Sequence, residues 1–134
     1  MISRSVNRIL VADDQEALRK RVCATLIRAS FEICGEAQNG REAVEKAAEL
    51  LPDAVVLDVT MPVLNGLDAA KMIRLTLPQI PILILSVHKS RQLIEEAKKI
   101  GVRGYVNKAD AGRDLIRALD AVLENSAFFP AEDI

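Results

Sequence analysis

The sequence predicts an α/β fold built on a five-stranded parallel sheet. Five short apolar runs alternate along the chain with segments whose apolar residues recur at helical spacing, as in strands joined by helical crossovers. Two of these runs, residues 54–57 and 82–85, are apolar at every position. Strands of that kind are typical of a parallel sheet that helices cover on both faces.

The composition bounds the class of protein. A chain of 134 residues suits one domain, and 50% hydrophobic and 28% charged residues are ordinary for a soluble protein. The net charge of -1 gives no reason to expect direct nucleic-acid binding. No apolar run approaches the roughly 20 residues of a membrane span and no signal peptide precedes Ile9, so we expect a cytoplasmic protein without membrane contact. Cys23 and Cys34 are predicted to be reduced and buried.

The first half of the chain predicts two strand–helix pairs. Residues 9–12 form the first strand, and the helix after it has four apolar residues at helical spacing: Leu18, Val22, Leu26 and Ala29. The basic run at residues 19–21 is interpreted as a solvated face of that helix. Residues 31–37 form a more polar strand, which we place nearer a sheet edge. Asn39 and Gly40 begin a second helix with its own apolar stripe: Val44, Ala47, Ala48 and Leu51.

The second half continues the alternation. After the strand at residues 54–57, Asn65 and Gly66 begin a helix with Ala69, Ala70, Ile73 and Leu77 on one face. The strand at residues 82–85 ends at Ser86, and the next helix ends at Gly101, a natural C-terminal cap. A short strand at residues 104–107 precedes the last helix, at about residues 111–125, whose inward residues are Leu115, Ala118, Leu119 and Val122.

Residues 1–127 are thus predicted to form one domain. The segment at residues 128–134 has two adjacent aromatic residues and a proline after a complete set of elements. We interpret it either as the start of a linker in a longer protein or as a docked C-terminal tail.

Polar side chains follow four of the predicted strands. Each comes directly after its strand: Asp13 and Asp14 after the first, Asp58 after the third, Ser86 after the fourth and Lys108 after the fifth. Because the carboxyl ends of parallel strands meet at one sheet edge, where open α/β folds bind ligands, these side chains are expected to converge. Any one of them alone would be unremarkable, but together they predict a functional site.

The electrostatics of this cluster predict a cation. Two carboxylates about 4 Å apart repel by about 4 kcal/mol at an effective dielectric near 20. Lys108 supplies one positive charge against three carboxylates, so a hard divalent ion completes the site, and ligands that are all oxygen favour Mg²⁺. With a cation present the edge could accept a phosphoryl group, with Asp58 as nucleophile, Ser86 as hydrogen-bond donor and Lys108 neutralising phosphate oxygens.

At these positions residues 8–125 resemble the receiver domains of two-component response regulators. That family has an acidic pair after strand one, a phosphoacceptor Asp after strand three, Ser or Thr after strand four and Lys after strand five, which here are Asp13-Asp14, Asp58, Ser86 and Lys108. Met61-Pro62 and Gly66 add to the match by their spacing from Asp58, and Tyr105 occupies the family's aromatic switch position.

The resemblance implies a flavodoxin-like (βα)5 three-layer sandwich with strand order 2-1-3-4-5. It implies that Asp58 accepts a phosphoryl group from a histidine kinase, with Mg²⁺ held by Asp14, Asp58 and the backbone carbonyl of Thr60, and with Asp13 acting through water. By this resemblance the chain is a signalling domain, not an enzyme with its own substrate.

Ala109 follows Lys108 where the family often has proline, which argues against a cis peptide there. This feature, with the sequence around Tyr105 and the Phe-Phe-Pro near the end, resembles receivers of the NarL/LuxR type. Such receivers are attached to a C-terminal helix-turn-helix effector, which is not in this chain. The resemblance also implies that a homodimer can form on phosphorylation.

Two further pairs of residues have expected roles. Thr60 and His88 each lie two residues beyond a site residue, and we expect them to tune the lifetime of the acyl phosphate. Ser86 and Tyr105 are expected to form the switch. In it Ser86 moves toward the phosphoryl oxygen and the hydroxyl of Tyr105 turns from solvent toward the loop at residues 88–90.

Three other readings are weighed against the receiver. A nucleotide- or flavin-binding module would have a Gly-rich or hydroxyl-rich loop after the first strand, whereas this chain has the acidic run 13–16. An aspartate-nucleophile phosphatase resembling the haloacid dehalogenase family would have a second acid two residues after the nucleophile, where this chain has Thr60. A degenerate receiver used only for protein contacts is the third, but no active-site residue is missing. A standalone receiver that acts by protein-protein contacts also stays an alternative.

Overall fold

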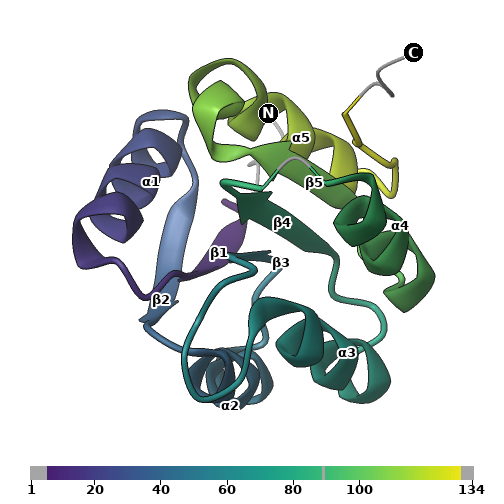
Figure 1. Ribbon diagram of the computed structural model, residues 1–134. Coiled ribbons are helices and arrows are strands. Elements are labelled where there is room, and N and C mark those ends of the chain that lie inside the picture. Colours follow the sequence, from purple (N-terminus) through teal and green to yellow (C-terminus); the bar gives the residue numbers. More distant parts are fainter. Residues whose placement is uncertain (1–5, 89, 131–134) are drawn as a thin grey trace.

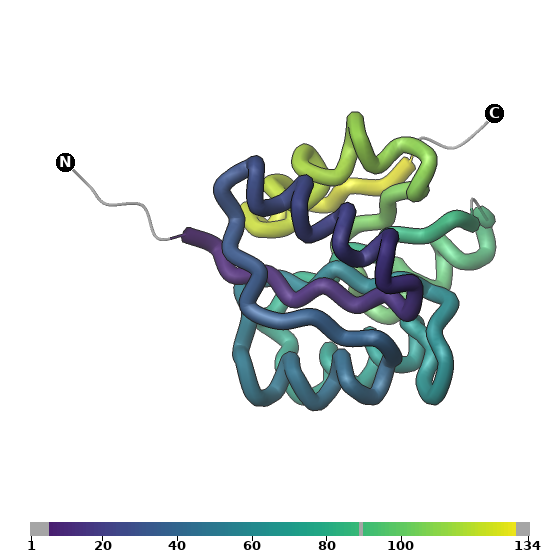
Figure 2. The backbone as a smooth tube through the Cα atoms, turned by 90° about the vertical axis from the view of Figure 1, so that its left-hand side faces the viewer, coloured from purple at the N-terminus to yellow at the C-terminus, as the bar shows by residue number. Residues whose placement is uncertain are grey.

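Five parallel strands form the middle layer of the molecule. The computed structural model describes residues 6–88 and 90–130, and its strands are β1 (Arg8–Ala12), β2 (Glu32–Ala37), β3 (Ala54–Leu57), β4 (Ile82–Ser86) and β5 (Gly104–Asn107). They are ordered β2-β1-β3-β4-β5, and Figure 2 shows β1 and β2 running side by side. This order and the parallel pairing confirm the predicted flavodoxin-like sheet, with the polar second strand at its edge.

Five helices cover the two faces of the sheet (Figure 1). Helices α1 (Glu16–Arg28) and α5 (Ala111–Leu123) lie on one face, and α2 (Gly40–Leu50), α3 (Gly66–Thr76) and α4 (Arg91–Ile100) lie on the other. A short 3-10 helix, η1 (Lys108–Asp110), precedes α5. The three layers match the predicted architecture. In the part of the chain that the structure describes, no helix has the length and apolar character needed to cross a membrane.

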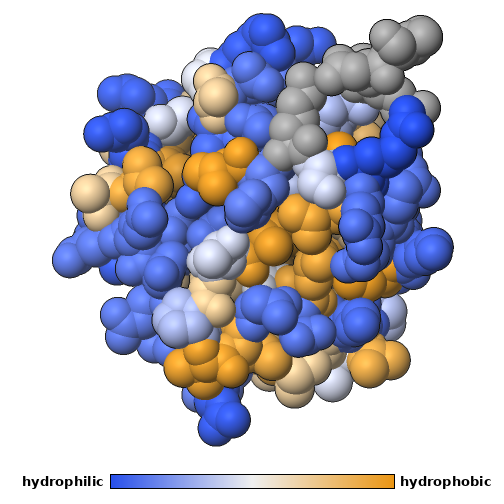
Figure 3. Space-filling model, in the orientation of Figure 1, coloured by the Kyte–Doolittle hydropathy of each residue, from blue (hydrophilic) through white to orange (hydrophobic). Residues whose placement is uncertain are grey.

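The core is divided by the sheet into two apolar clusters. Residues such as Leu10, Val55 and Ile84 face α2, α3 and α4, whereas Ile9, Val56 and Leu83 face α1 and α5. Both faces of β3 and β4 are therefore buried, which is why these strands are apolar at every position. On the outer surface seen in Figure 3, apolar side chains gather near the middle among hydrophilic ones.

Local sequence signals explain where the helices begin and end. The side chains of Asn39, Asn65 and Ser90 each accept a hydrogen bond from a backbone N–H in the first turn of α2, α3 and α4. Gly101 ends α4 in the left-handed conformation, at φ 100°, as predicted. The last helix, α5, ends at Leu123, slightly before the predicted end near residue 125.

Two predicted helix faces need correction. The buried residues of α1 are Arg19, Cys23 and Leu26, so its inner face is rotated by one position and Ala29 is exposed. Leu18 and Val22 are only half-buried. The interpretation of residues 19–21 as a solvated face is wrong for Arg19, because its charge is neutralised by Glu36 of β2.

The apolar stripe of α2 is also narrower than predicted. Ala43 and Ala47 are buried, Val44 packs against the core from a half-buried position, and Ala48 is exposed. Leu51 lies just beyond the helix in the left-handed region, at φ 48°, with its side chain 55% exposed. A cap residue turns away from the helix axis, so helical spacing no longer places its side chain on the inner face.

Gly66 is the position at which α3 packs against the end of β3. A Cβ atom there would lie 2.0 Å from the carbonyl oxygen of Asp58, and the Gly66 N–H donates to the carbonyl of Val59 at 2.8 Å. Two backbones approach each other here, so a side chain cannot be accommodated by rotamer changes alone. The absence of a side chain at Gly66 thus sets the course of the chain next to Asp58.

We therefore expect Gly66→Ala to lower the free energy of unfolding by at least about 1–3 kcal/mol, because the methyl group forces the backbone apart. Gly112→Ala is the control: nothing lies within 4 Å of its Cβ position in α5, so the substitution should be neutral or stabilise by up to about 1 kcal/mol. Urea unfolding midpoints measure both. Equal midpoints for the two variants would contradict the close approach at Gly66.

Candidate functional site

The ends of four strands bring the predicted site residues to one edge of the sheet. Carboxylate oxygens of Asp13, Asp14 and Asp58 lie within 4.8 Å of one another. Asp13 and Asp58 are only 3% and 6% exposed, whereas Asp14 is open to solvent. Ser86, the last residue of β4, is fully buried. The convergence predicted from the sequence is therefore present in the fold.

Lys108 joins two of the carboxylates. Its Nζ donates to Oδ2 of Asp13 at 2.8 Å and lies 3.5 Å from Oδ1 of Asp58. The lysine side chain is 15% exposed and follows β5, which lies two strands from β3 in the sheet. The ammonium group of Lys108, which follows β5, thus contacts carboxylates that follow β1 and β3. Its shorter contact is to Asp13. The peptide bond between Lys108 and Ala109 is trans.

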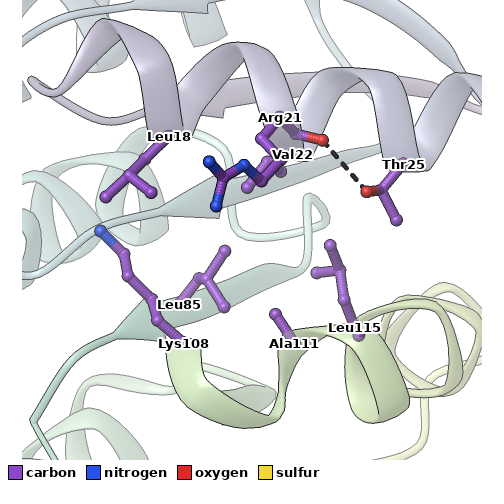
Figure 4. Close-up of a pocket in the computed structure, with 9 residues that line it drawn as sticks. Leu18, Arg21, Val22, Thr25, Leu85, Lys108, Ala111 and Leu115 are labelled. Carbon is purple, nitrogen blue, oxygen red and sulfur yellow. Dashed lines mark hydrogen bonds between the residues drawn. The ribbon is translucent and has the colours of Figure 1, made fainter.

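The stem of Lys108 lines a groove between α1 and α5 (Figure 4). Leu18 and Val22 from α1 face Ala111 and Leu115 from α5 across a cavity of about 280 Å³. Leu18 and Val22, which were predicted on the inner face of α1, therefore form one wall of a groove beside the site. The amino group of Lys108 leaves this apolar groove to reach the carboxylates.

The electrostatics of the site act most strongly on Asp58. Burial raises the pKa of its carboxyl group, Lys108 lowers it, and the neighbouring charges of Asp13 and Asp14 raise it further, for a net pKa above the ordinary value. One ammonium shared between two buried carboxylates does not balance the cluster. The donor set consists of carboxylate oxygens without nitrogen or sulfur, and this fits a hard divalent cation.

Arg19 holds the backbone of Asp13 in place, a role that was not predicted from the sequence. Its Nη1 donates to the backbone carbonyl of Asp13 at 2.7 Å, and its Nε donates to Glu36 at 2.9 Å. The backbone N–H of Gln15 donates to Oδ1 of Asp13 at 2.9 Å. The orientation of Asp13 is therefore fixed by bonds to both its backbone and its side chain. The available signal was the spacing 19, 23, 26, which places Arg19 on the face of buried Cys23 and Leu26.

The backbone of His88 connects Ser86 to Tyr105. The N–H of His88 donates to Oγ of Ser86 at 3.0 Å, and the hydroxyl of Tyr105 donates to the carbonyl oxygen of His88 at 2.8 Å. Burial raises the pKa of the Tyr105 hydroxyl. The expected contact between Tyr105 and the loop after Ser86 is thus made in this structure.

The starting position expected for Tyr105 was wrong. Its hydroxyl was expected in solvent before any phosphoryl group is bound, but the side chain is fully buried. The ring belongs to the apolar cluster under α2, α3 and α4, and the hydroxyl is satisfied by the His88 carbonyl, so the buried position costs no unpaired polar group.

Thr60 and His88 also lie together. Oγ1 of Thr60 and Nε2 of His88 are 3.3 Å apart, with the donor set by the tautomer of the histidine. Both residues are exposed and come from loops that follow different strands, β3 and β4. Both residues were expected near the site from their spacing, but no local sequence pattern predicts that their side chains touch.

Residues 9–120 match the family described as the response regulator receiver domain. The chain belongs to the response regulator receiver family. The receiver is a signalling domain of two-component systems, and this match decides against the nucleotide-binding and phosphatase readings. The family predicted from the acidic pair and the strand-end residues is therefore confirmed.

Two of the curated relatives differ in how much of their length this chain covers. The receiver is 36% identical over 126 residues to the transcriptional regulatory protein LnrK of Bacillus subtilis, covering 93% of this chain but 57% of that protein. It is 38% identical over 115 residues to the chemotaxis protein CheY of Thermotoga maritima, covering 86% of this chain and 96% of that protein. The matched part of this chain thus spans somewhat more than half of LnrK and nearly all of that CheY.

Solved structures agree. A LuxR-family two-component response regulator from Aurantimonas sp. SI85-9A1 superposes with a TM-score of 0.89 at 30% identity, covering 92% of this chain and 89% of that chain. The signal receiver domain of the putative response regulator NarL from Mycobacterium tuberculosis gives a TM-score of 0.83 at 26% identity, covering 90% and 98%. The receiver therefore resembles LuxR/NarL-family members, as the sequence indicated.

The raised pKa of Asp58 predicts that its negative charge lowers the free energy of unfolding of the metal-free receiver. The folded protein retains the Asp58 proton over a pH range in which the unfolded chain has lost it, so stability falls as pH rises through that range and the deficit persists at pH 7. We expect Asp58→Asn to raise the melting temperature in EDTA by a few degrees. Lys108 keeps its 2.8 Å contact with Asp13 in that variant.

Asp120→Asn is the matched control, since Asp120 is exposed on α5 away from the cluster. An unchanged or lower melting temperature for Asp58→Asn, with Asp120→Asn as reference, would contradict a raised pKa of Asp58 in the folded state.

Proposed function

We propose that this receiver accepts a phosphoryl group on Asp58 from a histidine kinase, in a Mg²⁺-dependent reaction, and that the acyl phosphate changes an output surface. The observation that supports this is the position of Asp58, a nearly buried carboxylate held at a strand end beside Lys108 and two further carboxylates. A rigid strand end keeps the nucleophile in place while the donor approaches.

The proposed chemistry is a displacement at phosphorus. An oxygen of the Asp58 carboxylate attacks the phosphorus atom of a phosphohistidine, the P–N bond breaks, and the departing imidazole keeps the electron pair and takes up a proton. The product is an acyl phosphate, which water later hydrolyses to Asp58 and inorganic phosphate. Lys108 neutralises a phosphoryl oxygen, and Ser86 donates a hydrogen bond to another. The receiver thus catalyses only its own modification and its reversal.

The carboxylate cluster fits Mg²⁺. Asp14 and Asp58 would hold the ion directly with the backbone carbonyl of Thr60, and Asp13 would act through water. When bound, the ion neutralises the charge of the carboxylates and of the entering phosphoryl group. In this arrangement Asp13 keeps its contact with Lys108, which holds the ammonium ready for the phosphoryl oxygen.

The output of the receiver is proposed from its relatives. LnrK is a transcriptional regulatory protein longer than this chain, and the matched Aurantimonas structure is from the LuxR family. We therefore infer a cytoplasmic regulator in which residues 1–127 are the receiver, residues 128–134 begin a linker or tail, and a helix-turn-helix effector outside this chain binds DNA. A phosphorylation-dependent homodimer is part of this proposal. Because CheY has nearly the length of this chain, a standalone receiver acting by protein contacts is the second candidate.

Incubation with acetyl phosphate and Mg²⁺ tests the proposal. We expect the intact mass to rise by one phosphoryl group, and to stay unchanged in EDTA or in Asp58→Asn, because the nucleophile or the neutralising cation is then missing. Asp120→Asn is the control and should be modified like the wild type. Modification of the Asp58→Asn variant to the same extent would assign the phosphoacceptor elsewhere.

Contact between Thr60 and His88 predicts that they act as one unit on the lifetime of the acyl phosphate. We expect Thr60→Val and His88→Ala each to shorten the half-life about two- to tenfold, the effect of losing a hydrogen bond of about 0.5–1.5 kcal/mol, because water then reaches the site more freely. The double variant should lose no more than either single variant. The decay of the phosphorylated mass measures this, and additive effects would show that the two side chains act separately.

A further inference from the structure

The outer edge of β5 is occupied by the chain's own C-terminal segment, residues 126–130. β5 is the last strand of the sheet, at the end opposite β2. Beyond it Phe128 forms a parallel bridge with Gly104: its N–H donates to the carbonyl of Arg103 at 3.0 Å, and its carbonyl accepts from the N–H of Tyr105 at 2.8 Å. The segment thus takes the place of a sixth strand and covers backbone groups that an edge strand leaves open.

The two aromatic residues of the segment anchor it on both faces of the sheet. Phe128 packs against the cluster under α1 and α5, with the guanidinium of Arg117 5.9 Å from the centre of its ring. Phe129 packs against the cluster under α2, α3 and α4, with the ammonium of Lys98 5.0 Å from its ring centre. The adjacent aromatic residues noted in the sequence therefore suit an extended strand, whose neighbouring side chains point to opposite faces.

Gly104 allows this approach. A Cβ atom at that position would lie 3.3 Å from the carbonyl oxygen of Phe128 and closer still to the side chains of Leu83 and Val122. A glycine inside a strand often marks a place where another backbone comes close. The start of β5 is thus shaped to receive a further strand.

Phe129 packs on the same side of the sheet as Tyr105. It follows Phe128, which pairs with Gly104, and its ring packs against the apolar cluster that contains Tyr105. On an edge strand the outer side of such a ring would be open to water. Here Tyr105 is fully buried, and its hydroxyl is bonded to the backbone of His88, next to Ser86.

We propose that the β5 edge, with the facing sides of α4 and α5, is a docking surface for residues 126–130, and that the docked segment holds Tyr105 in its buried position. The coupling to the phosphoryl site rests on the function proposed above. If an acyl phosphate favours the arrangement of Ser86 in which Tyr105 is buried, it also favours the docked segment. By linkage the docked segment then strengthens binding of a phosphoryl analogue by the same factor. The docking of residues 126–130 thereby depends on the state of Asp58.

The docking step is tested without any phosphate chemistry. Tyr105 is the only tyrosine and the chain has no tryptophan, so quenching of tyrosine fluorescence by acrylamide measures its exposure. In the full chain we expect Phe129→Ala to raise the quenching constant severalfold, and the conservative Phe129→Leu to raise it less. Phe31→Ala is the control, because Phe31 is a half-buried phenylalanine next to β2, at the opposite edge of the sheet.

Three outcomes are possible in this experiment. A rise in Phe129→Ala that is absent in Phe31→Ala supports the docked segment as a lock on Tyr105. Equal quenching in Phe129→Ala and wild type overturns it. An equal rise in both alanine variants also overturns it, because general loosening of the fold is then the cause.

Titration with beryllofluoride and Mg²⁺, an analogue of the acyl phosphate, tests the coupling. We expect Phe129→Ala to bind the analogue about fivefold or more weakly than wild type and Phe31→Ala. Equal affinity in all three proteins overturns the coupling. Absence of binding to wild-type protein contradicts the proposed function instead, and the acrylamide result then still decides whether the segment holds Tyr105.

Discussion

The contact of Lys108 with two buried carboxylates is the interaction on which the site depends. Its ammonium reaches Asp13 from β1 and Asp58 from β3, although the lysine itself follows β5. The parallel sheet brings these strand ends to one edge, where carboxylate oxygens of the three acids lie within 4.8 Å of one another and Lys108 contacts two of the acids. The remaining excess of negative charge makes the site receptive to cations and costs stability without one.

The residues at this edge could be predicted from sequence because the signal is local. An apolar run that ends in an acid, a hydroxyl or a lysine predicts both a strand and the side chain at its carboxyl end. In a parallel sheet these ends lie at one edge, so the side chains are predicted to converge. Arg19 could not be placed in the same way. Its burial depends on Glu36, a partner on a neighbouring strand that neutralises it, and a basic run on a helix is otherwise most simply explained as solvated. The contact between Thr60 and His88 likewise joins two loops whose relative position no local pattern gives.

The same distinction applies to the end of the chain. Two adjacent phenylalanines after the last helix are conspicuous in the sequence, but their partners are the free edge of β5 and the sides of α4 and α5. Those surfaces exist only once the strand order is known. The backbone of Tyr105 bonds to Phe128 and its hydroxyl to the His88 carbonyl, so this expected switch residue connects the edge with the loop that follows Ser86.

His88 contributes to the link between Ser86 and Tyr105 only through its peptide groups, which accept and donate independently of the imidazole. Its ring meanwhile faces Thr60. Under the proposed function, transmission to Tyr105 would rest on the backbone of His88 and the lifetime of the acyl phosphate on its ring. Under that proposal, removing the side chain at this position would shorten the lifetime of the acyl phosphate while the backbone connection to Tyr105 persists. Such a receiver could be adapted to slow or fast responses by a single substitution, without redesign of its output.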